Sequence, residues 1–415
     1  MATSGAFARP RWALVSGALA AVVIVGNVLA FGGTAGASAS LGAPHPAQGT
    51  SVTIGMITDA GGGANGTAGL VEAGAKMAVS YANAYGKGLD GHKITLYICE
   101  NQNTPAGGQT CANDMVQKGV VAVVEPFTGQ GATEVPTITK AGIPYITLSG
   151  ASEAELTTPG SFDLTGGFPA ILGGIALQAK SKGIKKVDFL VENVPAAIQG
   201  AQALGGLVFK AAGVGFEVTP VNVGTADMSP QLQSAVSGGA DAVGMVGDVT
   251  FCSSFLQAYN TLALTVPKYV LATCFDPSIL NSPTLDKALK GSYVATSAPS
   301  AQERALYAAM TKKYSPKTNP NPDISSNNVS GVTPVLALLG IMKGYSGSVT
   351  AAAVLEQTAA AKNVVLPLSG GITFTCNGTA IPLLKGVCSA ATSLGVVGNG
   401  VSVKGVKTYN PTPLF

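Results

Sequence analysis

The stretch VVEPFTGQGATEVPTITKAGIPYITLSGAS, from Val123 to Ser152, indicates the fold of the whole chain. Its pattern predicts a buried strand, a glycine-rich turn, a helix, a second strand and a turn of small residues. Strands that alternate with helices of this length indicate a parallel sheet with helices on both faces. Ligands of such sheets bind beyond the carboxyl ends of the strands, which is where both turns fall.

The two turns offer hydrogen-bonding groups without reactive ones. Thr128 and Gly129 follow the first strand, and Ser149, Gly150 and Ser152 follow the second. Glycines let a ligand approach the backbone, and N–H groups at the start of the helix near Gly129 can bind a carboxylate. We find no nucleophile with a neighbouring base and no metal-ligand cluster here. The turns therefore predict a site that holds a small polar molecule without transforming it. Ordinary turn composition is the alternative, since glycine and serine are common in turns.

The same alternation extends along the chain and then starts again. Three strand–helix units fill the region from Val52 to Leu148, and a second series fills Lys185 to Thr296. From Gly370 the pattern changes to short strands separated by Gly, Asn and Pro turns. The sequence therefore predicts an α/β protein with two doubly wound, Rossmann-like lobes.

The N-terminus has the plan of a secretory signal peptide. Arg9 and Arg11 precede an apolar run from Ala13 to Phe31, and two A-x-A cleavage sites lie within 35–39. We expect residues 1–39 to be removed and the protein to be exported. The alternative is an uncleaved leader that keeps the protein at the membrane, because the apolar run approaches the length of a membrane span.

Bulk composition excludes several classes of protein. Hydrophobic residues make up 47% of the 415 residues and charged residues 11%, so the chain is not intrinsically disordered. A net charge of +3 without a basic run gives no reason to expect a nucleic-acid partner. Arginine occurs only at Arg9, Arg11 and Arg304, so a bidentate arginine clamp for an anion is not expected.

The six cysteines fall into three close pairs along the chain. An even number in an exported chain predicts disulfides, although fifteen connectivities are possible in principle. Zinc is the alternative, but no C-x-x-C spacing is present and histidine is almost absent, so we expect no metal. Pairing of sequence neighbours is the most economical connectivity: Cys99 with Cys111, Cys252 with Cys274, and Cys376 with Cys388.

A glycine motif raises the possibility of a dinucleotide cofactor. GGGANG, from Gly61 to Gly66, satisfies G-x-G-x-x-G between a predicted strand and a predicted helix. The acid that ends the next strand, Glu100, lies well beyond the ~20 residues that a dinucleotide site requires. We therefore expect a loop at this position and no cofactor.

Hydrolase chemistry is not expected either. The sequence contains no G-x-S-x-G elbow and no P-loop. His92 fits a solvated turn better than a general base. Glu153 and Glu155 fit a solvated loop or the start of a helix, where the helix dipole favours acids.

Four motifs together resemble one family, the type I extracellular solute-binding proteins of ABC importers. This group includes leucine/isoleucine/valine-binding proteins. The resemblance follows the order of elements from Val52 to the C-terminus. The motifs are VTIGMITDAGG (52–62), GLDGHKITLYICENQNTPAGGQTCANDMV (88–116), VVAVVEPFTGQGATEVPTITKAGIPYITLSGAS (120–152) and GADAVGMVGD (239–248).

The resemblance implies two lobes joined by a hinge that close on a solute. It implies a binding protein and not an enzyme, a monomer that delivers its ligand to membrane permease subunits. A sensor that signals through a separate membrane partner is the alternative. The expected segments are a linker at 40–50, a first lobe of 51–167 plus 298–384, and a second lobe of 168–297 plus 385–415.

The resemblance also implies the ligand contacts. In amino-acid binders of the family, the first-lobe turns hold the ligand carboxylate, and the second lobe supplies an aromatic side chain and an acid. Asp248 stands where an aromatic residue is often found, so the sequence departs from the pattern there. The expected ligand is an amino acid, branched-chain-like, or a small organic acid or amide. The residues carried over are Thr128, Gly129, Ser149, Gly150 and Ser152 of the first lobe and Asp248 and Asp276 of the second.

Overall fold

Parallel strands form two separate sheets in the computed structural model, which describes residues 40–59, 66–315, 327–400 and 402–415. These residues belong to one unit of the chain, 37–415. The predicted signal peptide and residues 61–65 of the glycine motif lie outside the described residues. Within the described ranges, no helix is both long and apolar enough to cross a membrane.

The first sheet is wholly parallel, with the strand order β2-β1-β3-β4-β5. Its central strands are buried, and their near-continuous apolar runs are typical of a parallel sheet covered on both faces. β1 begins inside the segment predicted as a linker. The strands are β1 (Gly49–Thr58), β2 (His92–Glu100), β3 (Val123–Glu125), β4 (Tyr145–Thr147) and β5 (Ser161–Asp163).

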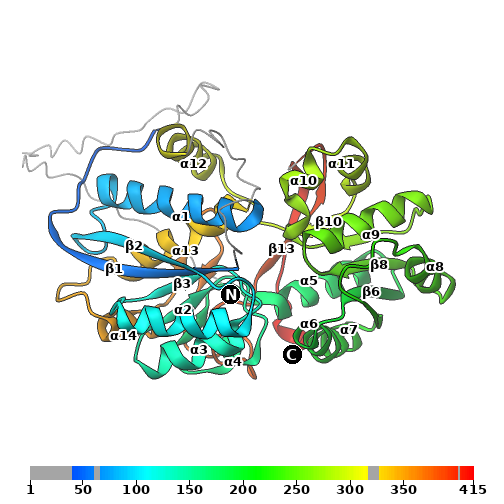
Figure 1. The fold of residues 1–415 in the computed structure, drawn as a ribbon, viewed down its shortest axis with the longest axis horizontal. Coiled ribbons are helices and arrows are strands. Elements are labelled where there is room, and N and C mark those ends of the chain that lie inside the picture. The colour runs from blue at the N-terminus through cyan, green and yellow to red at the C-terminus, as the bar shows by residue number, and fades with distance from the viewer. Residues whose placement is uncertain (1–39, 60–65, 316–326, 401) are drawn as a thin grey trace, which may run out of the picture. The chain divides into compact units, whose positions relative to one another are not determined.

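Helices from both ends of the chain cover the first sheet. α1 and α13 lie on one face and α2 and α3 on the other (Figure 1). A capping box of Ser300 and Glu303 begins α12. The helices are α1 (Gly66–Tyr85), α2 (Pro105–Gln117), α3 (Gly131–Lys140), α4 (Glu153–Thr157), α12 (Ala301–Tyr314), α13 (Asn328–Ile341) and α14 (Ala351–Ala359), with a hairpin of β11 (Val364–Val365) and β12 (Thr373–Phe374).

The second sheet has the order β14-β13-β10-β9-β8-β6-β7. Strands β6 to β10 are parallel, whereas β13 and β14 form an antiparallel hairpin on the β10 edge. The last strands of the chain therefore complete a sheet that begins more than 200 residues earlier. The strands are β6 (Lys186–Glu192), β7 (Gly215–Val221), β8 (Ala242–Val246), β9 (Lys268–Val270), β10 (Tyr293–Ala295), β13 (Thr392–Val397) and β14 (Val403–Tyr409).

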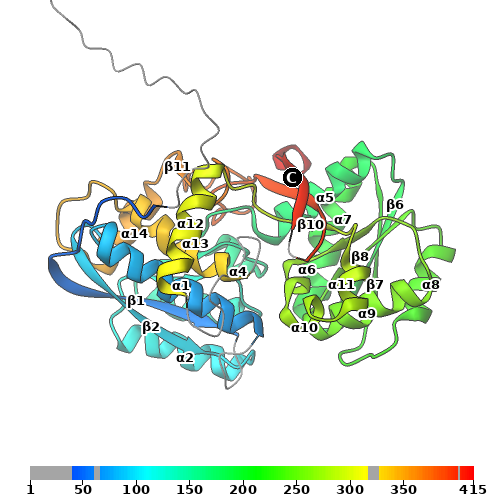
Figure 2. The ribbon, with the colours of Figure 1, turned by 90° about the horizontal axis from the view of Figure 1, so that it is seen from above.

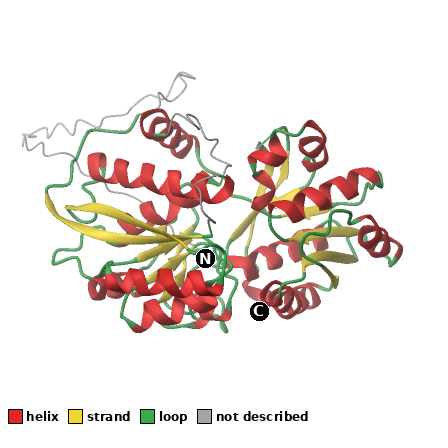
Figure 3. Ribbon diagram, in the orientation of Figure 1, coloured by secondary structure: helices red, strands yellow, loops and turns green. Residues whose placement is uncertain are grey.

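The second sheet also has helices on both faces (Figures 2 and 3). α5 and α7 pack in one core, and α8, α9 and α11 pack in another. A helix begins at Pro195, and a π-helical turn at Ala201–Gly205 interrupts it. The helices are α5 (Gly167–Ser181), α6 (Pro195–Gly200), α7 (Gly206–Ala212), α8 (Ser229–Ser237), α9 (Val249–Thr261), α10 (Pro277–Leu280) and α11 (Pro283–Leu289), with 3-10 turns at Ala272–Phe275 and Thr412–Leu414.

Three crossover segments, 164–166, 296–300 and 389–391, connect the elements of the first sheet to those of the second. The two-lobe α/β fold predicted from the sequence is confirmed. The exact lobe limits stay a prediction. Beyond 384, Asp163 of β5 donates its N–H to Gly386 and accepts from the Cys388 N–H, both at 2.8 Å, so this segment still lies against the first sheet.

All six cysteines are paired with their sequence neighbours, as predicted. The Cα atoms lie 5.6 Å apart in Cys99–Cys111, 5.7 Å apart in Cys252–Cys274 and 4.2 Å apart in Cys376–Cys388. The first bond joins β2 to α2, and the second joins α9 to the 3-10 turn after β9. The third ties together two segments that precede the last crossover.

Replacing Cys252 and Cys274 together by alanine is expected to lower the free energy of unfolding by about 3 kcal/mol, because the bond closes a loop and limits the unfolded chain. The two residues are 22 positions apart and fully buried. Denaturant unfolding of the variant checks this. The matched Cys99→Ala, Cys111→Ala variant should lose slightly less, since its cysteines are 12 apart. Unchanged stability in both variants would contradict the prediction.

Candidate functional site

The turn after β3 presents its donors to an acid of the chain itself. The Asp59 carboxylate accepts from the Thr128 hydroxyl at 2.8 Å and from the Gly129 N–H at 2.9 Å. Helix α3 begins at Gly131, two residues later than predicted, and Thr128 also accepts from the Gln130 N–H at 2.9 Å. The predicted anion seat at this turn is therefore filled by Asp59 in this structure.

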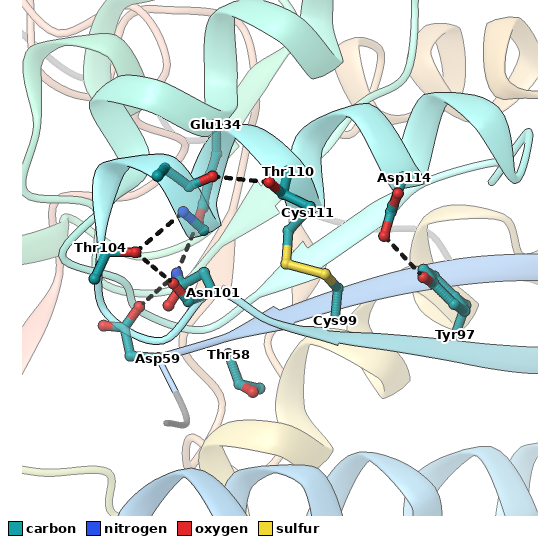
Figure 4. Close-up of a disulfide and its surroundings, with 12 residues drawn as sticks. Thr58, Asp59, Tyr97, Cys99, Asn101, Thr104, Thr110, Cys111, Asp114 and Glu134 are labelled. Atoms are coloured by element: carbon teal, nitrogen blue, oxygen red, sulfur yellow. Dashed lines mark hydrogen bonds between the residues drawn. A yellow bond between two sulfur atoms is a disulfide. The ribbon is translucent and has the colours of Figure 1, made fainter. Parts of the chain in front are cut away.

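Asn101 fixes Asp59 in that position. Its side chain is fully buried, and its Nδ2 donates to Asp59 at 2.7 Å and to Glu134 at 2.8 Å (Figure 4). Its Oδ1 accepts from the Asn103 N–H at 2.8 Å. Sequence reasoning missed Asp59, although it directly follows β1 and so lies at the same edge of the sheet as Thr128. The rule that located the two turns could have found it.

The second turn, after β4, is also bonded to acids of the chain. The Gly150 N–H donates to Asp163 at 2.8 Å. Ser152 is the N-cap of α4, and its hydroxyl donates to Glu155 at 2.8 Å. Gly167 is required beside this turn because its φ is +56° and a Cβ there would lie 2.3 Å from Asp163 Oδ2. The Ser149 N–H donates to the Thr147 hydroxyl at 3.4 Å.

A solvated loop or the start of a helix was expected for Glu153 and Glu155, and the start of a helix is confirmed because α4 begins at Glu153. Glu155 is not solvated: it is fully buried and forms a capping box with Ser152. Its carboxyl group lies against the start of α3, where a Cβ on Gly131 would lie 2.3 Å from Glu155 Cδ. Gly386, more than 200 residues later in the sequence, contacts the backbone of α4, because its N–H donates to the Leu156 carbonyl at 2.7 Å.

The buried acids beneath the two turns hold their protons more tightly than usual. Burial raises the pKa of Glu134 to about 7 and that of Asp163 to about 7. Burial and the neighbouring Glu134 hold the pKa of Glu125 well above its usual range. Both Glu125 oxygens are buried without a hydrogen-bond partner among the described residues, which favours the neutral form of this acid.

Both predicted acids of the second lobe cap helices. Asp248 is exposed, and its carboxylate accepts from the Phe251 N–H at 2.8 Å at the start of α9. Asp276 is buried and accepts from the N–H and the hydroxyl of Ser278 at 2.9 Å and 2.7 Å. Helix capping therefore accounts for an acid at both positions. A ligand contact by either one stays a prediction.

A cavity of about 210 Å³ lies where the three crossovers meet. Elements that belong to both sheets line it, including residues just after β4 and β9. The polar lining residues are Thr165, Thr296, Ser297, Asn327, Ser330, Thr333, Ser369, Thr392 and Ser393. The glycines and apolar residues are Leu148, Gly166, Gly167, Ala170, Ile171, Ala272, Phe275, Ala295, Val329, Leu366, Pro367, Leu368, Ile372 and Ala391.

The cavity does not contain the residues predicted for the site. Of the described residues that line it, none is one of the predicted seven, although Leu148 and Phe275 directly precede Ser149 and Asp276. No sequence pattern indicates this cavity, because its walls come from short connections that are far apart along the chain. In the described part of the protein, no group of three or more His, Cys, Asp or Glu could hold a metal ion.

The same two-lobe fold is found in proteins of known structure. The leucine-binding protein LivK of Thermotoga maritima is 19% identical, with a TM-score of 0.70 over 87% of this chain and 99% of that one. A solute-binding protein from R. palustris in complex with 4-hydroxybenzoate is 17% identical, with a TM-score of 0.68 over 87% and 98%. The fatty acid ABC transporter substrate-binding protein of Thermomonospora curvata is 15% identical, with a TM-score of 0.69 over 89% and 95%.

None of the curated proteins matches the sequence. The family described as periplasmic binding protein matches residues 51–384, which is most of the chain. This match confirms the resemblance inferred from the four motifs. The chain therefore belongs to the periplasmic binding protein family, whose members bind solutes and are not enzymes.

Proposed function

We propose that the protein is the extracellular substrate-binding component of an ABC importer, and that it takes up a small solute in the cavity at the crossovers. The observation that carries the proposal is the lining of that cavity. All three crossover segments contribute to it, together with residues that follow β4 of the first sheet and β9 of the second. Export, a monomeric state and delivery to permease subunits belong to the same proposal.

A ligand in this position can control the arrangement of the two halves. It contacts both halves at once, so it binds most tightly to the arrangement in which both sets of contacts are made. Crossover segments are short and can absorb the backbone rotation of a hinge movement. The bound and free forms would then differ in shape, and a membrane partner could distinguish them.

A thermal-shift screen tests the proposal. The panel contains amino acids, hydroxybenzoates, fatty acids and amides, since the similar proteins of known structure are named for amino acids, 4-hydroxybenzoate and fatty acids. We expect at least one class to raise the melting temperature of the wild-type protein with saturation at one ligand per chain. The absence of any saturable shift across the panel would contradict the proposal.

The Ser330→Tyr variant tests whether the ligand binds in the cavity. Ser330 is half-buried on α13 and lines the cavity, so a tyrosine ring there would fill space that the ligand needs. We expect this variant to lose the thermal shift, a loss of at least about tenfold in affinity. The matched control is Ser234→Tyr, on the exposed side of α8, which should bind like the wild type. Equal binding by both variants would place the ligand elsewhere.

The sensor alternative stays a prediction. It shares the binding step with the proposed function and differs only in the partner. Uptake of a bound solute by membrane vesicles that contain the permease would favour import, whereas ligand-dependent binding to a membrane receptor without uptake would favour sensing.

A further inference from the structure

We infer that the solute is an uncharged and largely apolar molecule with a hydrogen-bond acceptor, and not an amino acid or an organic anion. This inference rests on the proposed function, because it concerns the ligand of the same cavity. Three features of the described residues support it: the lining of the cavity, the side chain of Asn327 and the bonding of Asp59.

The lining lacks a partner for a charged ligand. Of the described residues that line the cavity, none is Asp, Glu, Lys, Arg or His. An ionised carboxylate or ammonium that leaves water without a charged partner or several hydrogen bonds binds at a large cost in free energy. A zwitterion would need such partners at both ends. An uncharged molecule loses much less hydration, and the apolar lining can contact its body.

The amide group of Asn327 requires a hydrogen-bond acceptor in the ligand. Its side chain lines the cavity and is only 4% exposed, and among the described residues no acceptor bonds its Nδ2 group. Buried amide donors are nearly always bonded in folded proteins, and an unbonded one destabilises the structure. A carbonyl, ether or hydroxyl oxygen of a ligand would satisfy this donor. The serine and threonine hydroxyls of the lining can donate or accept, so they adapt to either kind of group.

Asp59 makes the nearby first-lobe turn unsuitable for an anion. Its two oxygens already accept from Asn101, Thr128 and Gly129 at 2.7, 2.8 and 2.9 Å. An incoming carboxylate would have to displace Asp59 and would then lie beside its negative charge, which is unfavourable. Gly150 and Ser152 likewise donate to Asp163 and Glu155. Donors of four of the five predicted first-lobe residues are therefore engaged within the protein: Thr128, Gly129, Gly150 and Ser152.

Matched acid and amide pairs test the inference with the intact protein. Isovalerate with isovaleramide, and benzoate with benzamide, differ in charge and hardly in shape. We expect the amides to bind at least about tenfold more tightly than the acids by calorimetry. Acids that bind as tightly as their amides would overturn the inference and leave the proposed function intact. No binding by either member of any pair would overturn the inference, while the wider screen decides the proposed function separately.

Variants of Asn327 and Asp59 test which residues make the protein prefer uncharged ligands over anions. Asn327→Leu should weaken amide binding about tenfold, because it removes the unbonded donor; Asn327→Ser, a smaller change, serves if that variant does not fold. Asp59→Ala should free the anion seat, so that acetate raises its melting temperature with saturation. The matched control is Asp241→Ala, which removes an exposed carboxylate that accepts two backbone N–H bonds at 2.7 and 3.2 Å. Amide binding unchanged in the Asn327 variants, or no greater acetate effect in D59A than in D241A, would overturn the inference.

Discussion

Gly331→Ala is expected to lower the free energy of unfolding by about 3 kcal/mol or more, although it adds only one methyl group. Gly331 lies on α13, where that helix crosses α1. A Cβ placed on it would lie 1.9 Å from the carbonyl oxygen of Val71 and 2.9 Å from the N atom of Ala75. Backbone atoms cannot rotate away as side chains do. The two helices would have to separate, and the core between them would lose packing.

Each of the two helices has a glycine in close contact with the backbone of the other, so the expected loss of stability is large. A Cβ on Gly74 of α1 would lie 2.0 Å from the carbonyl oxygen of Asn328 on α13. Asn328 also joins the helices through its side chain, which donates to the Leu70 carbonyl at 3.0 Å. Small residues at both contact points are what allow two helix backbones to approach in this way.

Gly206→Ala is the matched control. Gly206 also lies in a helix, but a Cβ there would meet no atom within 4 Å. Alanine is a better helix former than glycine, so this variant should gain about 0.5–1 kcal/mol. Urea unfolding of both variants measures the difference. Equal stability of the two would show that the α1–α13 contact tolerates separation, contrary to the prediction.

Lowering the pH from 8 to 5 is expected to stabilise the protein through its buried acids. The folded chain binds the protons of Glu134 and Asp163 with pKa values of about 7, whereas an unfolded chain binds such protons near about 4. Their contribution is therefore fully present below the unfolded value and is lost as the pH rises through about 7. Each such shift is worth about 3 kcal/mol. The measurement is the free energy of unfolding in urea across this pH range.

Glu134→Gln isolates one of these contributions. Glutamine keeps the acceptor for Asn101 and cannot titrate, so this variant should show a clearly smaller rise in stability between pH 8 and pH 5. The remaining acids of the cluster that act on Glu134 are Glu125, Asp59 and Glu155. Glu356→Gln on the exposed side of α14 is the control and should follow the wild type. Parallel curves for wild type and E134Q would refute the prediction.

The fold could be predicted because its signals are local. Alternating strands and helices, the capping box at Ser300 and the spacing of the cysteines are each contained in short stretches. The same holds for Thr128 and Ser149, whose place after a strand follows from the strand itself. Their partners do not follow from it, because Asp59 lies 69 residues before Thr128 and only the parallel pairing of strands brings them together.

Burial of the acids could not be predicted for a related reason. The S-x-x-E pattern at Ser152 indicates the start of a helix, and on an exposed helix Glu155 would be solvated. Its carboxyl group is buried against Gly131, and that contact depends on how α3 packs beside α4. The cavity depends in the same way on three crossovers whose meeting point no local pattern encodes.

The late position of α13, β13 and β14 along the chain has a consequence for biosynthesis. The residues synthesised first cannot complete the core of either half. The first sheet is covered by a helix that starts at Asn328, and the second sheet is completed by a strand that starts at Thr392. The nascent polypeptide must therefore emerge almost entirely before either half is sealed. A frameshift or proteolytic nick near the carboxyl terminus would leave the β10 edge unpaired and open to self-association.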